Sequence, residues 1–187
     1  SCTNLTLGIG QDKMGATPLQ LANAMCIIAN KGYYYTPHFV KNIDGETNED
    51  TVLMNKYRKK HEVLTQISDD AFNAVMDGME AVVTNGTARN AKIANVNVCA
   101  KTGTAEKYAI LDGQRIKLEN NAMFVAFAPK EDPKIAIAVV VENAGYGGTW
   151  GGPIARILME KYLNDSLTKE SQADYDRVST TNKMPKH

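Results

Sequence analysis

One segment constrains the fold most. Ile135–Val141 is apolar at every position, and only Pro129–Lys134 separates it from another apolar segment, Ala122–Ala128. A strand that is apolar throughout is typical of a sheet covered on both faces. A linker this short cannot make a parallel crossover, so the two strands should pair antiparallel. The sequence therefore predicts an antiparallel sheet between two layers of helices.

A third strand and a hairpin complete the predicted sheet. Val96–Lys101 has strand composition, and Leu111-Asp112-Gly113-Gln114 is a turn signal with apolar flanks, which predicts an elongated hairpin. The three main strands follow one another along the chain. We therefore expect a three-stranded antiparallel meander with helices around it, in the α+β class (an α/β sandwich).

Three helices are predicted to cover the sheet. The first begins at Thr17-Pro18, with a capping hydroxyl and proline at the first helical position, and ends at Gly32. The second runs from the N-cap Ser68 to Asn85-Gly86. Its expected buried face consists of Phe72, Val75, Met76, Met79, Val82 and Val83. The third begins at Pro153, after a glycine-dense loop at 145–152.

The length of 187 residues fits one domain. We assign residues 1–163 to it and expect 164–187, which are polar and aperiodic, to form a disordered tail. The segment 44–62 is charged and poorly patterned. No apolar run reaches the roughly 18–20 residues of a membrane helix, so we expect a soluble chain.

Composition excludes several classes of function. Lys plus Arg and Asp plus Glu both total 21, and a formal net charge of zero argues against a nucleic-acid partner. The three cysteines, Cys2, Cys26 and Cys99, form no CxxC pair, and the histidines are isolated, so we expect no metal site. Cys26 and Cys99 fit buried small hydrophobic positions, and the redox state of the cysteines stays open. No nucleotide motif is complete, so no cofactor is expected.

The segment Lys101-Thr102-Gly103-Thr104 carries the most chemical information. An ammonium group and two hydroxyls favour an anionic ligand such as a carboxylate. Thr102 and Thr104 share one face of a strand, so both hydroxyls can reach one ligand, and Gly103 lets a substrate backbone lie alongside. An edge strand also offers unpaired N–H groups that can stabilise an oxyanion.

This segment resembles the K-T-G motif of penicillin-recognising serine transpeptidases and β-lactamases. Further segments are similar to one branch, the class B penicillin-binding proteins of the elongation type (penicillin-binding protein 2). They are Gly8–Gln11, Ala16–Ala24, Ile28–Tyr33, Thr36–His38, Val83–Ala88, Ala122–Pro129, Val140–Trp150 and Pro153–Ala155, in the order of the family. The resemblance implies the C-terminal half of a transpeptidase domain, with a partial penicillin-binding transpeptidase or serine β-lactamase-like fold.

The resemblance also implies a function and roles for residues. The family cross-links peptidoglycan stem peptides by D,D-transpeptidation and is acylated by β-lactams. Lys101 is then expected at the active-site edge, holding the proton network and the anionic ligand. Thr102 and Thr104 are expected to bind the ligand carboxylate, Gly103 to keep the strand open, and the backbone N–H of Thr104 to form half of the oxyanion hole.

The sequence departs from the family at the nucleophile. Family members carry S-x-x-K and S-x-N motifs before the segments matched here. This chain has no Ser-x-Asn, and its one Ser-x-x-Lys, Ser166–Lys169, follows the K-T-G motif in the polar tail. We therefore do not expect Ser166 to be a nucleophile, and we expect a fragment that is inactive alone. Self-association should cover either the exposed edge of its incomplete sheet or the helix faces left without a partner.

For the parent protein, the resemblance implies an inner-membrane anchor, a periplasmic catalytic domain and a membrane glycan polymerase as partner. Two other functions stay open. One is a β-lactamase or β-lactam sensor of the same superfamily, which turnover of bound antibiotic would reveal. The other is a non-catalytic binding module, which would have no S-x-x-K upstream of Ser1.

Overall fold

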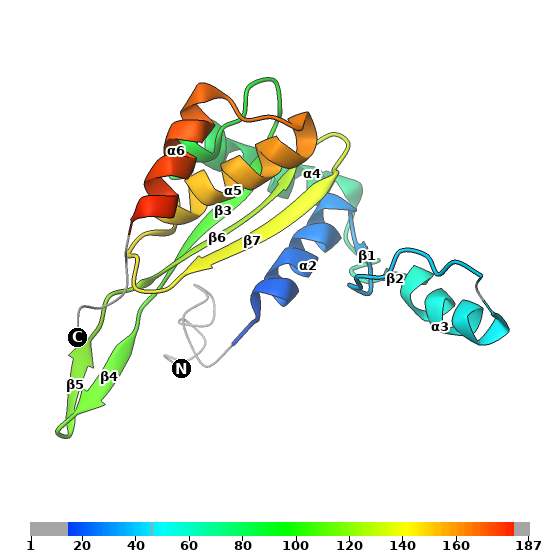
Figure 1. Cartoon of the computed structure of the whole chain (residues 1–187), viewed down its shortest axis with the longest axis horizontal. Helices are drawn as coiled ribbons and strands as arrows, with labels where there is room; N and C mark the ends of the chain where they lie inside the picture. Colours follow the sequence, from blue (N-terminus) through cyan, green and yellow to red (C-terminus); the bar gives the residue numbers. More distant parts are fainter. Residues whose placement is uncertain (1–14, 46, 182–187) are drawn as a thin grey trace.

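The computed structural model describes residues 15–45 and 47–181. Its centre is a sheet of three antiparallel strands in the order β3-β6-β7 (Figure 1). These are β3 (Cys99–Ala105), β6 (Asn121–Ala128) and β7 (Ile135–Val141). The register pairs Lys101 with Val125 and Val125 with Ala138. The predicted meander is confirmed, although β3 begins at Cys99 instead of Val96 and continues through the whole K-T-G motif instead of ending at Lys101.

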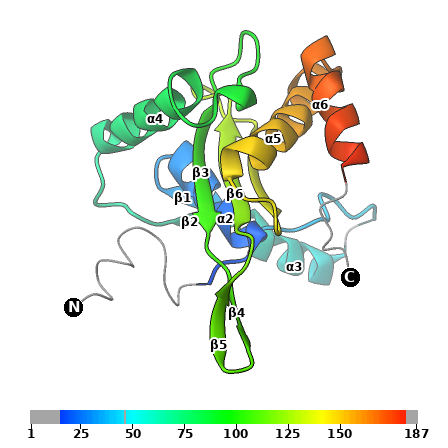
Figure 2. The ribbon, with the colours of Figure 1, turned by 90° about the vertical axis from the view of Figure 1, so that its left-hand side faces the viewer.

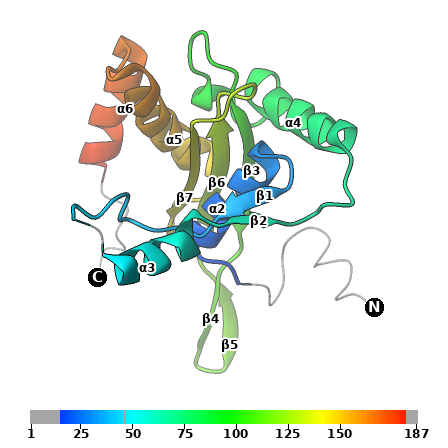
Figure 3. The same ribbon diagram turned by 90° about the vertical axis from the view of Figure 1, so that its right-hand side faces the viewer.

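Helices cover both faces of the sheet, as predicted. Alternate residues of β6 point to opposite faces, so Phe124 packs with Met159 of α5 (Gly147–Asn164), whereas Phe127 packs with Met25 of α2 (Pro18–Ala29). The helix α4 (Asp69–Thr84) packs against β3. Figures 2 and 3 show α5 on one side of the strands and α2 on the other.

Helix α2 begins and ends where the sequence predicts. Thr17 and Gln20 form a capping box around Pro18 at the first helical position. Gly32 follows the helix with a φ of 107°, and a Cβ there would lie 2.7 Å from the carbonyl oxygen of Val63. The turn therefore requires glycine.

Helix α4 is confirmed from its N-cap Ser68 to Thr84. Phe72, Met76, Met79 and Val83 are buried, and Val82 is half-buried against the core. Val75 is 49% exposed, so its predicted burial is wrong. The sheet reaches only the stripe centred on Met76 and Met79, and Val75 lies at its margin.

The segment 44–62 is more regular than its sequence suggests. It contains α3 (Asn48–Arg58), capped by Thr47 and Asp50, and β2 (Lys60–Glu62), which pairs with β1 (Tyr33–Tyr35). Of α3, only Met54 is buried. Local capping therefore defines this helix, and it has no apolar stripe that periodicity could reveal.

The predicted hairpin is confirmed. Strands β4 (Tyr108–Leu111) and β5 (Gln114–Lys117) pair antiparallel and project from the sheet (Figure 1). Asp112 and Gly113 have φ values of 51° and 77°. Two consecutive residues with positive φ are the geometry of the tight turns that join twisted strands, which explains the Asp-Gly pair.

Helix α5 begins at Gly147, six positions before the predicted start at Pro153, which lies inside the helix. A Cβ on Gly151 would collide with Cβ of Phe124, so the absence of a side chain lets the helix lie directly on β6. In the sequence, the glycines of this segment indicate a loop. In the structure, those from Gly147 on belong to the helix and allow its close contact with the sheet. The predicted start is wrong because packing overrides local propensity.

The expected disordered tail is wrong for residues 169–180. They form α6 (Lys169–Thr180), capped by Thr168. The buried guanidinium of Arg156, on α5, bonds Glu170 at 2.5 Å and Asp174 at 2.6 Å. Because ionic contacts and an N-cap hold this helix in place, it does not need an apolar stripe, and its sequence shows none.

Strand β7 is less buried than its composition predicts. Only Val139 is buried, and Val140 is 37% exposed. Helices do lie on both of its faces, but β7 is an edge strand of the described sheet. Among the described residues, no helix is long and apolar enough to cross a membrane.

Candidate functional site

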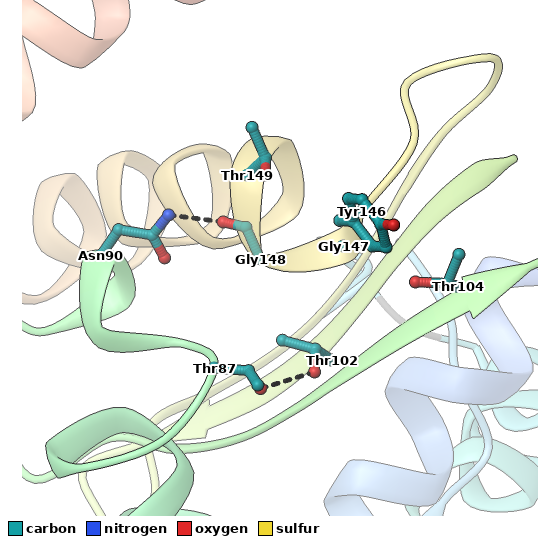
Figure 4. A pocket seen from close by; sticks show the side chains of 8 residues that line it. All are labelled: Thr87, Asn90, Thr102, Thr104, Tyr146, Gly147, Gly148 and Thr149. Atoms are coloured by element: carbon teal, nitrogen blue, oxygen red, sulfur yellow. Dashed lines mark hydrogen bonds between the residues drawn. The ribbon is translucent and has the colours of Figure 1, made fainter. Parts of the chain in front are cut away.

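A cavity of about 470 Å³ lies where three segments meet at the edge of the sheet (Figure 4). The segments are strand β3, the loop after α4 that leads into a short 3-10 helix (Arg89–Ala91), and the first turn of α5. The lining residues are Thr87, Asn90, Thr102, Thr104, Tyr146, Gly147, Gly148 and Thr149. Four of these eight residues are threonines, which bring hydroxyl groups to the walls.

Two hydrogen bonds hold the three segments together. The hydroxyls of Thr87 and Thr102 share one at 2.8 Å, which joins the loop to β3. The amide nitrogen of Asn90 donates to the carbonyl oxygen of Gly148, which joins the same loop to α5. The loop at 85–91 thus positions both walls of the cavity (Figure 4).

The glycines at the start of α5 are required by this close approach. A Cβ on Gly147 would collide with the carbonyl oxygens of Met123 and Gly103. A Cβ on Gly148 would lie 2.5 Å from the carbonyl oxygen of Thr87. Any side chain here would separate α5 from β3 and open the cavity.

Thr102 and Thr104 both line the cavity, so the expectation that they share one face of the strand is confirmed. Lys101 lies on the opposite face, since neighbouring residues of a strand alternate. Its ammonium is exposed and donates to the carbonyl oxygen of Thr102 at 2.7 Å. The structure therefore brings together the two threonines and separates the lysine side chain from their cavity.

Gly103 lies close to the neighbouring strand. A Cβ there would be 3.3 Å from Cβ of Met123, which is tighter than ordinary contact. A small residue at this position therefore serves the packing of β3 on β6. Its expected role in leaving room for a ligand stays a prediction.

The electrostatics of the cavity favour an anion. Helix α5 starts at the cavity, and its N-cap residue Tyr146 provides no side-chain hydrogen bond to the first turn. The positive end of the helix dipole and the first amide groups are therefore directed toward this region. Together with the threonine hydroxyls, they suit a carboxylate.

Sequence reasoning missed most of the lining outside the K-T-G motif. It assigned no role to Thr87, Asn90, Tyr146 or Thr149, which line the cavity. Thr87 follows Asn85-Gly86, which ends α4. This end of a helix is the sequence signal that could have drawn attention to Thr87. Nothing in local spacing could show that this loop reaches β3.

Ser166 and Lys169 do not form a nucleophile pair of the expected type. The Ser166 hydroxyl is exposed and donates to the carbonyl oxygen of Asn164 at 3.2 Å. Helix α6 begins only at Lys169, so the two residues do not lie on one helical turn. This placement agrees with the expectation that Ser166 is not the nucleophile.

The described cysteines are free thiols. Cys99 is fully buried, its thiol donates to the carbonyl oxygen of Met76 at 3.4 Å, and burial raises its pKa to about 12. Cys26 is half-buried, and desolvation raises the pKa of its thiol too. Cys2 lies outside the described residues. Within residues 15–45 and 47–181, no group of three His, Cys, Asp or Glu side chains could hold a metal.

Comparison with known proteins agrees with this geometry. Residues 3–160 match the family model of the penicillin-binding protein transpeptidase domain. The chain is 36% identical over 176 residues to the peptidoglycan D,D-transpeptidase MrdA of Haemophilus influenzae. That match covers 87% of the chain and only 26% of the relative, so the chain spans about a quarter of its length.

Two solved structures are similar as well. Penicillin-binding protein 2 of Pseudomonas aeruginosa, in complex with WCK 5153, has a TM-score of 0.66 and 33% identity, over 89% of this chain and 34% of that one. The protein of the same name from Helicobacter pylori, in complex with MreC, has a TM-score of 0.66 and 28% identity, over 87% and 28%. The chain therefore belongs to the penicillin-binding protein transpeptidase domain family.

Proposed function

We propose that this chain is part of a serine-type peptidoglycan D,D-transpeptidase and carries the carboxylate-binding edge of its active site. The observation that carries the proposal is the cavity in which Thr102 and Thr104 face the start of α5. A stem peptide and a β-lactam both present a carboxylate, which two hydroxyls and a helix N-terminus can bind.

Each residue of the motif has a distinct part in this proposal. The hydroxyls of Thr102 and Thr104 bind the carboxylate, and the backbone N–H of Thr104 donates to the oxyanion of the tetrahedral intermediate. Lys101, on the other face of β3, holds the proton network on the side where its ammonium is exposed. Gly103, which has no side chain, keeps the strand open to the ligand.

The chain alone does not form an acyl-enzyme, because no S-x-x-K motif precedes its K-T-G motif and it has no S-x-N motif. The nucleophile belongs to a part of the protein outside this chain. We propose that the whole protein is anchored in the bacterial inner membrane, with this domain in the periplasm. A membrane glycan polymerase is the proposed partner, and the likeness to the Helicobacter pylori protein makes an MreC-like protein a second candidate.

A chimaera tests the function. The matched segment of the Haemophilus influenzae MrdA protein is replaced by residues 3–160 of this chain, and a fluorescent penicillin reports acylation. We expect the chimaera to be labelled covalently. Thr102→Val removes a hydrogen bond to a charged group and should slow acylation roughly 10- to 100-fold.

The matched control is Thr51→Val, the same chemical change on the exposed surface of α3. It should leave labelling within about twofold of the unmodified chimaera. A folded chimaera that is never labelled, or one that Thr102→Val and Thr51→Val affect equally, contradicts the proposal. Rapid release of the bound label would instead indicate a β-lactamase.

A further inference from the structure

A second cavity lies beside the one that Thr102 and Thr104 line. Its volume is about 380 Å³, and it lies between the end of β5 and the loop before α5. Its lining residues are Lys117, Leu118, Glu119, Asn120, Gly145 and Tyr146. Tyr146, which Figure 4 shows beside Gly147, lines both cavities, so the two are neighbours.

Main-chain hydrogen bonds hold the walls of this second cavity in place. The carbonyl oxygen of Asn120 accepts from the amide of Ala144 at 3.0 Å and from that of Gly145 at 2.9 Å. These two bonds join the segment before β6 to the loop before α5. The amide of Leu118 donates to the carbonyl oxygen of Lys107 at 2.9 Å, which closes the base of the hairpin. Backbone contacts of this chain therefore form the cavity.

Two hydrogen-bond acceptors in the lining have unused capacity. The side-chain oxygen Oδ1 of Asn120 is buried, and no group in the described part of the chain donates to it. Glu119 is exposed, and its carboxylate has no ion pair or hydrogen bond within residues 15–45 and 47–181. Because a buried acceptor without a donor is unfavourable, this pair of acceptors indicates a ligand that donates hydrogen bonds.

The charges of the lining favour a cationic ligand. The ammonium of Lys117 lies 2.8 Å from the carboxylate of Glu106, so the positive charge of Lys117 is balanced within the hairpin. The negative charge of Glu119 is then the uncompensated one. The ring of Tyr146 adds an aromatic face, which attracts cations. A primary ammonium group, with one positive charge and three donors, matches this lining.

We propose that the second cavity binds a primary ammonium group of the peptide whose carboxylate occupies the first cavity. This inference rests on the proposed function, because a peptide that is cross-linked to another of its kind must carry an amine as well as an acyl end. The carboxylate binds at Thr102 and Thr104, and the ammonium binds at Glu119 and Asn120. These last two residues therefore select peptides with an amine-bearing side chain.

Nuclear magnetic resonance of the isotope-labelled 187-residue chain tests the proposal, with N-acetyl-lysyl-D-alanyl-D-alanine as the probe. We expect the peptide to shift the amide signals of 102–104 through its carboxylate and those of 118–120 through its ammonium. A second peptide carries an acetyl group on the lysine side chain, which removes the positive charge. It should shift 102–104 only and bind about threefold to fivefold more weakly, as expected for the loss of an exposed ion pair.

Variants assign the effect to the two acceptors. Glu119→Gln keeps the shape of the side chain and removes its charge, so it should weaken binding of the lysyl peptide about threefold to fivefold. It should leave binding of the acetylated peptide unchanged. Asn120→Asp adds a negative charge at the same place and should strengthen binding of the lysyl peptide.

Glu49→Gln is the matched control, because it makes the same chemical change at an exposed residue in the first turn of α3. It should leave the affinities for both peptides unchanged. Circular dichroism of each variant checks that the fold persists.

Butylammonium separates this inference from the proposed function, because it has no carboxylate and no acyl group. It should shift 118–120, and Glu119→Gln should weaken that shift. Butylammonium binding at 118–120 together with a peptide that never shifts 102–104 would contradict the proposed function and still support the ammonium site. A lysyl peptide that shifts 102–104 but not 118–120 would contradict the ammonium site alone.

Three results overturn the proposal. The first is that neither butylammonium nor the lysyl peptide shifts the amides of 118–120. The second is equal affinity for the lysyl and the acetylated peptide. The third is that Glu119→Gln and Glu49→Gln change binding of the lysyl peptide to the same extent.

Discussion

The hydroxyls of Thr87 and Thr102 share a 2.8 Å hydrogen bond although 15 positions of sequence separate them. Thr87 lies in the loop after α4, and Thr102 lies in the centre of β3. The bond fixes the side chain of Thr102 at the cavity, where a ligand carboxylate would accept from it. A loop without a conspicuous motif therefore orients a residue of the motif.

Thr87→Val should lower the free energy of unfolding by only about 0.5–1 kcal/mol, because the lost hydrogen bond is exposed. In the MrdA chimaera it should slow acylation by fluorescent penicillin more than this small loss of stability suggests, since Thr102 loses its orienting partner. Thr87→Ser keeps the hydroxyl and should restore the rate. Equal rates for the Val and Ser variants would contradict a positioning role.

Gly151→Ala should destabilise the chain by about 2–3 kcal/mol, because the new methyl group collides with Phe124 beneath α5. Gly78→Ala in α4 is the matched control, since nothing lies within 4 Å of a Cβ there. That change should stabilise the chain by about 0.5–1 kcal/mol through helix propensity. Urea unfolding measures both, and the same sign for the two variants would contradict the close packing of α5.

Arg156→Ala should release α6 from α5, because it removes both ion pairs to Glu170 and Asp174. We expect a loss of about 1–3 kcal/mol and rapid proteolysis between residues 164 and 180. Arg177→Ala removes a more exposed partner of Asp174 and should cost less than about 1 kcal/mol. Proteolysis that is unchanged in Arg156→Ala would show that α6 does not depend on this contact.

The pKa of Cys99 predicts alkaline sensitivity. Burial raises this pKa to about 12, so the unfolded chain releases the thiol proton at a lower pH than the folded chain does. Stability should therefore fall as pH rises from about 9 toward the folded pKa. Cys99→Ala removes this contribution, and urea unfolding at several pH values should show a shallower decline. Equal slopes for the two proteins would contradict the buried neutral thiol.

The elements that the sequence located are those with local chemical signals. The capping box at Thr17 and Gln20 fixes the start of α2, and Asp112-Gly113 supplies the positive φ values of the hairpin turn. The strands β6 and β7 follow from their apolar runs. Because side chains alternate between the two faces of a strand, the sequence also indicates that Thr102 and Thr104 share a face, and both line the same cavity.

The elements that the sequence concealed depend on distant contacts. Helix α6 is polar, and its docking rests on Arg156. The glycines of α5 have poor helix propensity and become helical because they fit against Phe124 and Gly103. The loop that contains Thr87 and Asn90 joins the site through hydrogen bonds to Thr102 and Gly148, which no local pattern encodes.

In the proposed function, this chain holds the binding edge of a transpeptidase site and lacks the nucleophile of that site. Incubation of the purified 187-residue chain with a fluorescent penicillin, read by denaturing gel and intact mass, tests it most directly. We expect no covalent adduct. A stoichiometric adduct, mapped by peptide analysis to Ser166 or any other residue, would contradict the account.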